Sequence, residues 1–365
     1  MGEGPEVETD PQYYIDQAES AIAEAENEIL HHPNYTDEKA AVSLPAGSVD
    51  GLQAAIAQAG PWGKVVVQSG MHYESGTVTV THPVRIIGKK GAVIQTTTVL
   101  PSDPQSILSG IPFVADPAIF VKDANFVQVR NLDFVPDPTT GQGSTGILAV
   151  NSNHVYIRGN SFSSYLNAVI IHESDFATII KNEAEGLYSE GFTGYGSYGF
   201  TVATGRNARV FDNYAEDYQG NFFVSDERGI YLKNTSEGGE VGFIYCTYSA
   251  NLVLQPDGTP VGASIPAKNW LGVRNTANNH VIGHLVIDGS NNCTLVSNAA
   301  SNCLLYEVEF VGATTRLDPL VPVAPVTFDN LFIAGSEPNI QVKDCGVGNT
   351  IIGGNQVDLN VDPCF

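Results

Sequence analysis

The chain has 365 residues, of which 42% are hydrophobic, so it is long enough to bury a substantial core. Its 17 Lys and Arg against 40 Asp and Glu give a formal net charge of −23, which argues against nucleic acid as a partner because phosphates require cations. No apolar run approaches the length of a membrane span, which excludes an integral membrane protein. The charged fraction of 16% and the 37 glycines favour strands and turns over a helical bundle.

Two helices are predicted near the N-terminus. Residues 10–32 begin with Asp10 as N-cap and Pro11 in the first turn. Their apolar residues recur at steps of three and four, and the opposite face is rich in glutamate, so a docked surface helix is favoured over a free partner-binding arm. A second helix is predicted within 48–60, with Ser48 as its cap. The apolar stripe of the first helix consists of Ile15, Ala18, Ile22, Ala25 and Ile29.

Short strands follow the second helix, and helical periodicity does not return. Turn residues such as Ser69-Gly70 and His82-Pro83 separate these segments. The first four predicted strands are Lys64–Gln68, Thr77–Val80, Val84–Ile87 and Val93–Gln95.

An internal repeat dominates the rest of the chain. A small or strand-opening residue is followed fourteen positions later by Asn, or once by Asp. The successive Asn positions are 22, 31, 21, 64 and 46 residues apart, which suits multiples of about 22 with insertions. The apolar alternation around residues 220–234 is shifted by one residue. The repeat pairs are Gly146/Asn160, Ala168/Asn182, Gly199/Asn213, Gly220/Asn234, His284/Asn298 and Asn330/Asp344.

A period near 22 with two short strands per unit predicts a parallel β-helix, in which stacked coils bury a continuous apolar core. The recurring Asn is interpreted as scaffold, because its amide can bond both backbone and the Asn one coil above. The sequence therefore divides into an acidic helical arm at 1–45 and a β-helix domain at 46–365. The predicted inward residues are Ile147, Ala149, Val155, Ile157, Val169, Ile171, Ala177, Ile179, Phe200, Val202, Ala208 and Val210.

Two groups of segments resemble the pectin-lyase-like right-handed parallel β-helix superfamily. Gly63-Lys-Val-Val-Val-Gln-Ser-Gly-Met-His-Tyr-Glu74 is similar to its first coils, and Val155-Tyr-Ile-Arg-Gly-Asn160 to its generic repeats. The resemblance covers residues 45–357 and implies an all-β, right-handed parallel β-helix with N-terminal capping helices. That fold hosts lyases, hydrolases, esterases, epimerases and adhesins. The catalytic motifs of its calcium lyases, polygalacturonases, methylesterases and alginate epimerases are missing, so no catalytic residue is carried over.

Three connections between predicted strands are longer than the rest, at 135–145, 183–198 and 256–283. Because coils stack in register, we expect these loops to leave one corner and to wall a single groove. Aromatic rings and carboxylates suit sugars, whose C–H faces stack on rings, although Tyr and Gly are also common loop fillers. The predicted substrate-binding residues are Tyr195, Tyr198, Tyr214, Tyr218, Lys268, Trp270 and Arg274.

Hydrolysis and β-elimination both suit such a groove. Hydrolysis requires two carboxylates that flank the scissile bond. Elimination requires a base, for which Tyr188 is a candidate, and a cation such as Lys268 or Arg274 to neutralise a uronate carboxylate. His172, outward in the repeat, is a further acid or base, although an outward His of this kind is more often inert. The predicted catalytic residues are Glu190, Glu216, Asp217, Tyr188 and His172.

No cofactor is certain from the sequence. Calcium held by carboxylate pairs such as Asp226-Glu227 is one candidate, although surface pairs of this kind are more often only solvated. The five cysteines fit no zinc spacing and predict either one or two disulfides of a secreted protein or buried thiols. They are Cys246, Cys293, Cys303, Cys345 and Cys364.

The residues after Met1 have neither the basic start nor the apolar core of a signal peptide, so we expect a mature secreted or cell-surface protein. The favoured function is that of a carbohydrate-active enzyme, a polysaccharide lyase or glycoside hydrolase, whose partner is a polysaccharide or oligosaccharide. The alternative is a non-catalytic glycan-binding or cell-surface module, and an epimerase is a third candidate. The sequence specifies no oligomeric state.

Overall fold

A computed structural model provides the structure. It describes residues 8–35, 40–97, 113–114, 116–188, 197–245, 253–254, 268–287, 290–311, 327, 329–335 and 339–357.

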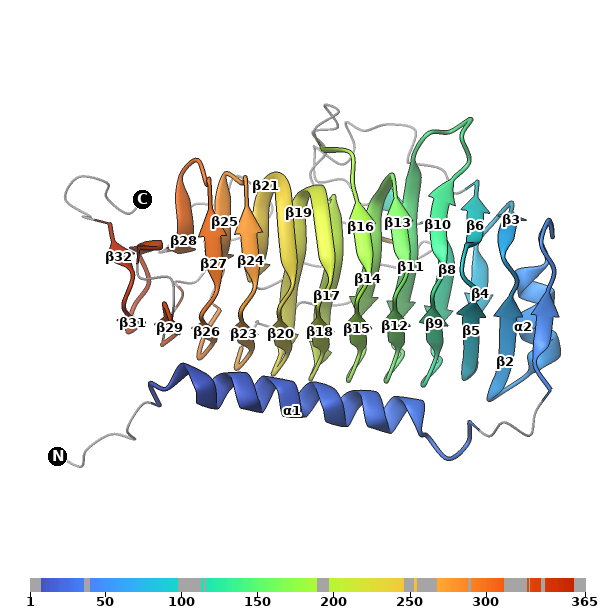
Figure 1. The fold of residues 1–365 in the computed structure, drawn as a ribbon, viewed down its shortest axis with the longest axis horizontal. Coiled ribbons are helices and arrows are strands. Elements are labelled where there is room, and N and C mark those ends of the chain that lie inside the picture. The colour runs from blue at the N-terminus through green and yellow to red at the C-terminus, as the bar shows by residue number, and fades with distance from the viewer. Residues whose placement is uncertain are drawn as a thin grey trace.

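These residues wind into a right-handed parallel β-helix, which confirms the predicted fold (Figure 1). Each coil contributes one strand to a twelve-stranded parallel sheet, here called the first sheet. Its strands are β1 (Val42–Leu44), β2 (Gly63–Val67), β5 (Val84–Gly88), β9 (Gln128–Arg130), β12 (Tyr156–Arg158), β15 (Thr178–Ile180), β18 (Arg209–Phe211), β20 (Ile230–Leu232), β23 (Leu271–Val273), β26 (Thr294–Val296), β29 (Leu331–Ile333) and β31 (Thr350–Ile352).

An eighteen-stranded sheet completes the coils and bends into two faces. The second face holds β3 (Gly70–Glu74), β6 (Ala92–Thr96), β10 (Asp133–Pro136), β13 (Ser161–Ser163), β16 (Glu183–Glu185), β24 (Thr276–Asn278) and β27 (Ala299–Ser301). The third face holds β4 (Val78–Val80), β8 (Pro117–Lys122), β11 (Gly143–Val150), β14 (Tyr165–His172), β17 (Tyr198–Arg206), β25 (Ile282–Val286), β28 (Tyr306–Phe310), β30 (Gln341–Asp344) and β32 (Asn355–Gln356). Two long strands run through both faces, β19 (Tyr214–Glu227) and β21 (Thr235–Tyr245).

The core is a column of inward side chains that repeats from coil to coil. All twelve residues predicted to point inward are buried in one continuous cluster, which confirms that prediction. The predicted irregularity near 220–234 is also present. Phe200 is the partner of Phe222, so Asn221 lies opposite Gly199, where the repeat had placed Gly220. The Phe200, Phe222 and Phe243 rings stack along the axis at 5.4 and 4.6 Å between centroids.

A buried asparagine ladder runs along the corner between the first sheet and the second face. In each step the Nδ2 of one Asn donates to the Oδ1 of the next, as from Asn160 to Asn182 at 3.0 Å. The same Nδ2 also bonds a backbone carbonyl, that of Val129 for Asn160. Both bonds were predicted, because a tight bend leaves backbone groups that need partners. The ladder consists of Asn160, Asn182, Asn213, Asn234, Asn275 and Asn298.

The last predicted repeat pair is wrong. Asn330 precedes β29 and accepts from the backbone N of Cys293, so it lies at the opposite end of the first-sheet strands and bonds Asn349 there. Asp344 ends β30 on the third face. Asn275, which the fourteen-residue pairing missed, divides the 64-residue gap in the ladder.

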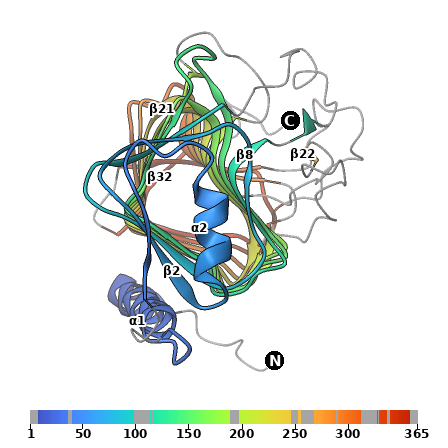
Figure 2. The ribbon, with the colours of Figure 1, turned by 90° about the vertical axis from the view of Figure 1, so that its right-hand side faces the viewer.

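Helix α1 (Pro11–Leu30) lies along the outside of the first sheet, so the docked interpretation is confirmed (Figures 1 and 2). Its buried stripe, which includes Ile15 and Ile22, packs on outward residues of the sheet such as Leu232 and Val273. Glu26 pairs with Arg158 and Glu19 with Lys233, both at 2.8 Å.

Helix α2 (Leu52–Ala59) closes the N-terminal end of the core (Figure 2). The predicted Ser48 cap is wrong, because the Ser48 hydroxyl bonds Nδ1 of His72. Glu74, the last residue of β3, accepts from the Leu52 N–H at 3.0 Å. β1 pairs with β2, so the β-helix begins inside the segment predicted as the arm.

Breaking the ladder should destabilise the fold far more than removing an outward asparagine. Asn213→Ala deletes the acceptor of two Asn182 donors and the donor to the Ile179 carbonyl, all buried. We expect unfolding in urea to require about 3 kcal/mol less free energy. Asn278→Ala, on the outside of β24, is the control and should cost under about 1 kcal/mol. Equal losses would contradict the structural role of the ladder.

Candidate functional site

The long connections do not form one wall, so that expectation is wrong. The links from β10 to β11 and from β16 to β17 join the second face to the third. The link from β21 to β23 instead returns from the third face to the first sheet. The two groups therefore flank opposite edges of the third face. β7 (Phe113–Val114) and β22 (Val253–Leu254), which pair in parallel, lie outside that face (Figure 2).

Two residues predicted to bind substrate lie in the core. Tyr218 is 0% exposed and Trp270 is 1% exposed, and the Trp270 ring stacks on Tyr245 at 4.1 Å between centroids. The strand period turns both side chains inward, so a polysaccharide has no access to them, and the prediction is corrected. Glu190 and Tyr195 lie outside the described residues.

His172 points outward from β14, as predicted, but it is not accessible. Its side chain is 1% exposed, and Thr204 Oγ1 lies 3.1 Å from Nε2. Loss of hydration lowers the pKa of His172 from 6.5 to about 4. Tyr198, at the start of β17, packs edge-on against Phe223 at 4.9 Å between centroids. Neither residue faces the remaining predicted site residues.

Asp226 and Glu227 do not form a calcium pair, because their side chains diverge. Asp226 is fully buried and accepts from the Tyr231 hydroxyl at 2.7 Å. Burial raises the pKa of Asp226 from 3.8 to about 7. Glu227 pairs with Lys268 at 3.8 Å and also with Arg206 and Arg228. Among the described residues, no group of three or more His, Cys, Asp or Glu could hold a metal ion.

The cysteines divide between the two predicted states. Cys345 is disulfide-bonded, whereas Cys293 and Cys303 are free thiols. Cys246 and Cys364 lie outside the described residues.

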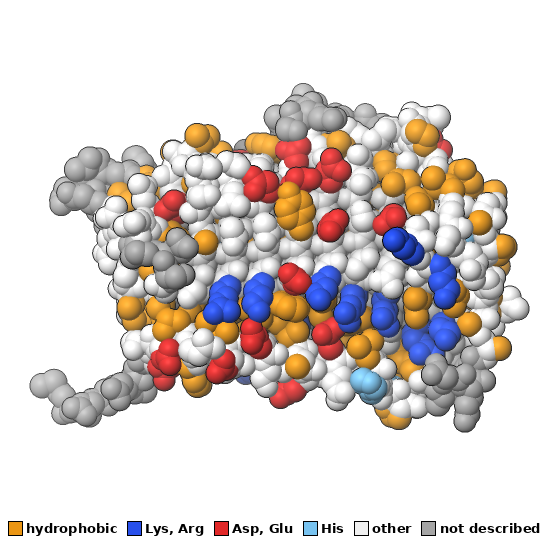
Figure 3. All heavy atoms as spheres, in the orientation of Figure 1, with side chains coloured by type: hydrophobic (Ala, Val, Ile, Leu, Met, Phe, Trp, Pro, Cys, Tyr) orange, Lys and Arg blue, Asp and Glu red, His pale blue; other side chains and the backbone are white. Residues whose placement is uncertain are grey.

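The second face brings carboxylates together on its outer side. Glu185, Glu216 and Glu237 occupy the same position on three consecutive strands, so they form a column, here called the carboxylate column. Neighbouring strands are about 4.8 Å apart. Figure 3 shows acidic side chains gathered over this face. Of the column, the sequence had indicated only Glu216. The other two follow once the coils are aligned by the asparagine ladder.

Tyrosine and amide groups hold these carboxylates. The Tyr214 hydroxyl donates to Glu216 Oε2 at 2.6 Å. Burial and the nearby carboxylates, Glu216 foremost, raise the pKa of Tyr214 far above its usual range. Asn278 and Asn279 both donate to Glu237. Tyr188, at the edge of this face, donates to Glu240 at 3.4 Å. The predicted residues Tyr188, Tyr214 and Glu216 therefore belong to one surface, and Asp217 directly follows Glu216 in β19.

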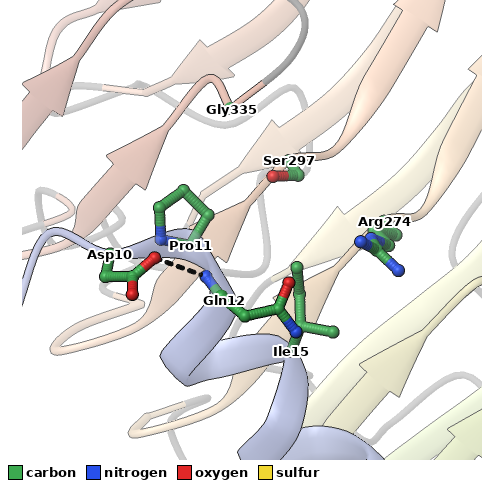
Figure 4. Close-up of a pocket in the computed structure, with 7 residues that line it drawn as sticks. All are labelled: Asp10, Pro11, Gln12, Ile15, Arg274, Ser297 and Gly335. Carbon is green, nitrogen blue, oxygen red and sulfur yellow. Dashed lines mark hydrogen bonds between the residues drawn. The ribbon is translucent and has the colours of Figure 1, made fainter.

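Basic side chains line the corner between this face and α1 (Figure 3). We call them the basic row, and α1 carboxylates bind two of its members, Arg158 and Lys233. Arg274 lines an open hollow of about 510 Å³ beside the start of α1, together with Asp10 and Gln12 (Figure 4). The predicted Lys268 is not part of this row. It precedes β23, so it lies where the strands of the first sheet begin, whereas the row lies where they end. The row consists of Arg130, Arg158, Lys181, Lys233 and Arg274.

Comparison with known proteins identifies no family. No family model and no curated protein matches the chain. A Geobacillus virus E2 protein, ORF18, matches at 14% identity over 92% of this chain and 63% of its own, with a TM-score of 0.44. The GH87 α-1,3-glucanase catalytic domain matches at 11% identity over 88% and 69%, with a TM-score of 0.43. The Azotobacter vinelandii mannuronan C-5 epimerase A-module matches at 13% identity over 84% and 90%, with a TM-score of 0.40.

This chain therefore spans about 63% of the length of the viral protein. In the described part of the chain, no helix has both the length and the apolar character needed to cross a membrane.

The buried acid Asp226 predicts a pH dependence of stability that an amide variant removes. Its raised pKa means that the folded chain holds a proton that the unfolded chain releases, so its contribution to stability is lost as the pH rises from 3.8 to about 7. The free energy of unfolding of Asp226→Asn, minus that of the unmodified protein, should therefore increase by about 4 kcal/mol over this interval. Above it, the difference should be constant.

Urea titrations across this pH range measure the difference directly. His172 and His284 are buried, and their pKa values are lowered from 6.5 to about 4. Their contribution to the free energy of unfolding is therefore lost as the pH falls, which is the opposite of the effect of Asp226. Both proteins share these histidines, and their effect cancels in the difference. A difference that is independent of pH would show that Asp226 is ionised in the folded chain.

Proposed function

We propose that the protein is an exported carbohydrate-active β-helix protein that binds a polysaccharide along its second face. The observation that carries this proposal is the carboxylate column with Tyr214, on the face whose outer side is open among the described residues. α1 covers the first sheet, and the outward side chains of the third face, such as Leu148 and Ile170, are buried. Carboxylates accept hydrogen bonds from sugar hydroxyls, and an aromatic ring offers a surface for sugar C–H groups.

The arrangement favours hydrolysis over elimination. The backbones of the strands that carry Glu185 and Glu216 are neighbours, about 4.8 Å apart. From this spacing two side chains on the same face can place their carboxyls about 5 to 5.5 Å apart, the separation that retaining glycosidases use. The predicted bases do not suit elimination. His172 is buried, and Tyr188 donates its hydroxyl to the carboxylate of Glu240. Like charges at this spacing destabilise a sheet, so the column serves no purpose in the fold itself.

The two carboxylates take different parts in the proposed reaction. Glu216, positioned by the Tyr214 hydroxyl, attacks the anomeric carbon, and the leaving oxygen takes a proton from Glu185. Glu185 then removes a proton from the water that releases the sugar from Glu216. The reaction therefore consumes one water molecule for each glycosidic bond that it breaks.

A non-catalytic glycan-binding module is the second candidate. Asn278 and Asn279 hold Glu237, and Ser301 in turn donates to Asn278 at 2.7 Å. Such a chain of fixed polar groups across β21, β24 and β27 suits recognition of hydroxyls without any reaction.

Product analysis with two variants tests the proposed hydrolysis. On a panel of neutral and uronate polysaccharides, we expect new reducing ends and no ultraviolet absorbance from unsaturated ends. Glu216→Gln and Glu185→Gln should each lower kcat by about 10²-fold or more. Glu173→Gln, an exposed carboxylate at the other corner of the third face, should leave kcat unchanged.

The outcomes of these assays separate the candidates. Unsaturated products would replace hydrolysis by elimination. Binding that Tyr214→Ala weakens, without any product, would identify the binding module. Neither binding nor product on the whole panel would overturn the proposal.

A further inference from the structure

A column of aromatic rings lies at the corner that precedes the strands of the first sheet. Phe126, His154 and Phe176 occupy equivalent positions on successive coils, each with a positive φ. The rings of Phe126 and His154 stack at 4.4 Å between centroids, and those of His154 and Phe176 at 4.9 Å. Bulky residues seldom adopt this backbone conformation, so the column is a specific feature of these coils.

The column ends at Phe176. One face of the Phe176 ring stacks on His154, and no further ring of the column stacks on the other face. The next coil places Asn207 in the equivalent position, also at positive φ. Phe176 is 43% exposed, which is unusual for a large apolar side chain. Phe176 lines a hollow of about 150 Å³ between the β-helix and α1, and Asn207 of the next coil lines it too.

The hollow combines this ring with groups of both charges. Glu24 and Glu28 line it from α1, and Asn207 and Arg209 line it from the β-helix. The Arg209 guanidinium is held in place by its Nη1, which donates to the backbone carbonyls of Ala208 and Arg228, and its buried Nε has no hydrogen-bond partner among the described residues. A volume of 150 Å³ corresponds to about five water molecules, which is room for one sugar ring but not for a chain.

We propose that this hollow is a binding site for a single neutral pyranose residue, stacked on Phe176. The two glutamates disfavour an anion, and Arg209 disfavours a cation, which leaves an uncharged ligand with many hydroxyls. The ring accepts the C–H face of the sugar, while Asn207, Arg209 and the glutamates bond its hydroxyls. The site is separate from the second face and is formed only when α1 is docked. It would anchor a glycan end or branch outside the proposed catalytic face.

Saturation-transfer NMR with methyl glycosides of glucose, galactose, mannose and N-acetylglucosamine tests this site on the full chain. We expect at least one glycoside to bind with a Kd on the order of a millimolar, with the strongest transfer to the protons of one C–H face. Phe176→Ala should weaken binding at least tenfold. Tyr73→Ala is the matched control, because Tyr73 is also 43% exposed but lies on β3, and it should bind unchanged.

Two more variants distinguish loss of the ring from loss of the fold and from binding at the second face. Phe176→Leu keeps an apolar side chain against His154 and removes only the flat ring, so it should fold, by circular dichroism, and still lose binding. Glu216→Gln should bind the glycosides normally, which separates this site from the proposed hydrolytic one. The inference is overturned if no glycoside binds or if Phe176→Leu binds as the unmodified protein does. Binding of tetramethylammonium in place of the glycosides would also overturn it.

Discussion

Six buried asparagine side chains, each hydrogen-bonded to the next, set the register of the coils from Asn160 to Asn298. A tight corner in a β-helix leaves backbone groups that no sheet can satisfy, and water cannot reach them inside the fold. The ladder supplies both a donor and an acceptor at every step. Because the side chains of a strand alternate strictly, the register also fixes which residues face outward. The carboxylate column and the aromatic column both follow from it.

The outer sides of the three faces differ in what covers them, and this difference decides where a ligand can bind. Apolar residues outside the first sheet require a cover, which α1 provides with its own apolar stripe. Ion pairs with Arg158 and Lys233 then hold one edge of the helix. The acidic face of α1 thereby neutralises part of the basic row. The second face keeps polar outward side chains and needs no cover, so within the described part of the chain it presents an open surface to a long ligand.

The two proposed binding surfaces use different physical means. On the second face, carboxylates of like charge are held close together by Tyr214, Asn278 and Asn279, at an electrostatic cost that the fold does not require. In the hollow beside α1, a single ring and charges of both signs surround a small volume. The first arrangement suits an extended substrate, and the second suits one sugar ring.

The sequence by itself determined the β-helix, the inward residues, the docked helix and most of the asparagine ladder, because each depends on a periodicity that short stretches of chain display. It also indicated Tyr214 and Glu216. It did not determine which corner each long connection leaves, so Lys268 was grouped with residues on another face and Trp270 was placed outside the core. Glu74 as the cap of α2, and Glu185 and Glu237 beside Glu216, became evident only from the stacking of coils. These contacts join residues more than twenty positions apart, and only the tertiary structure, through the number of residues inserted between coils, decides which of them meet.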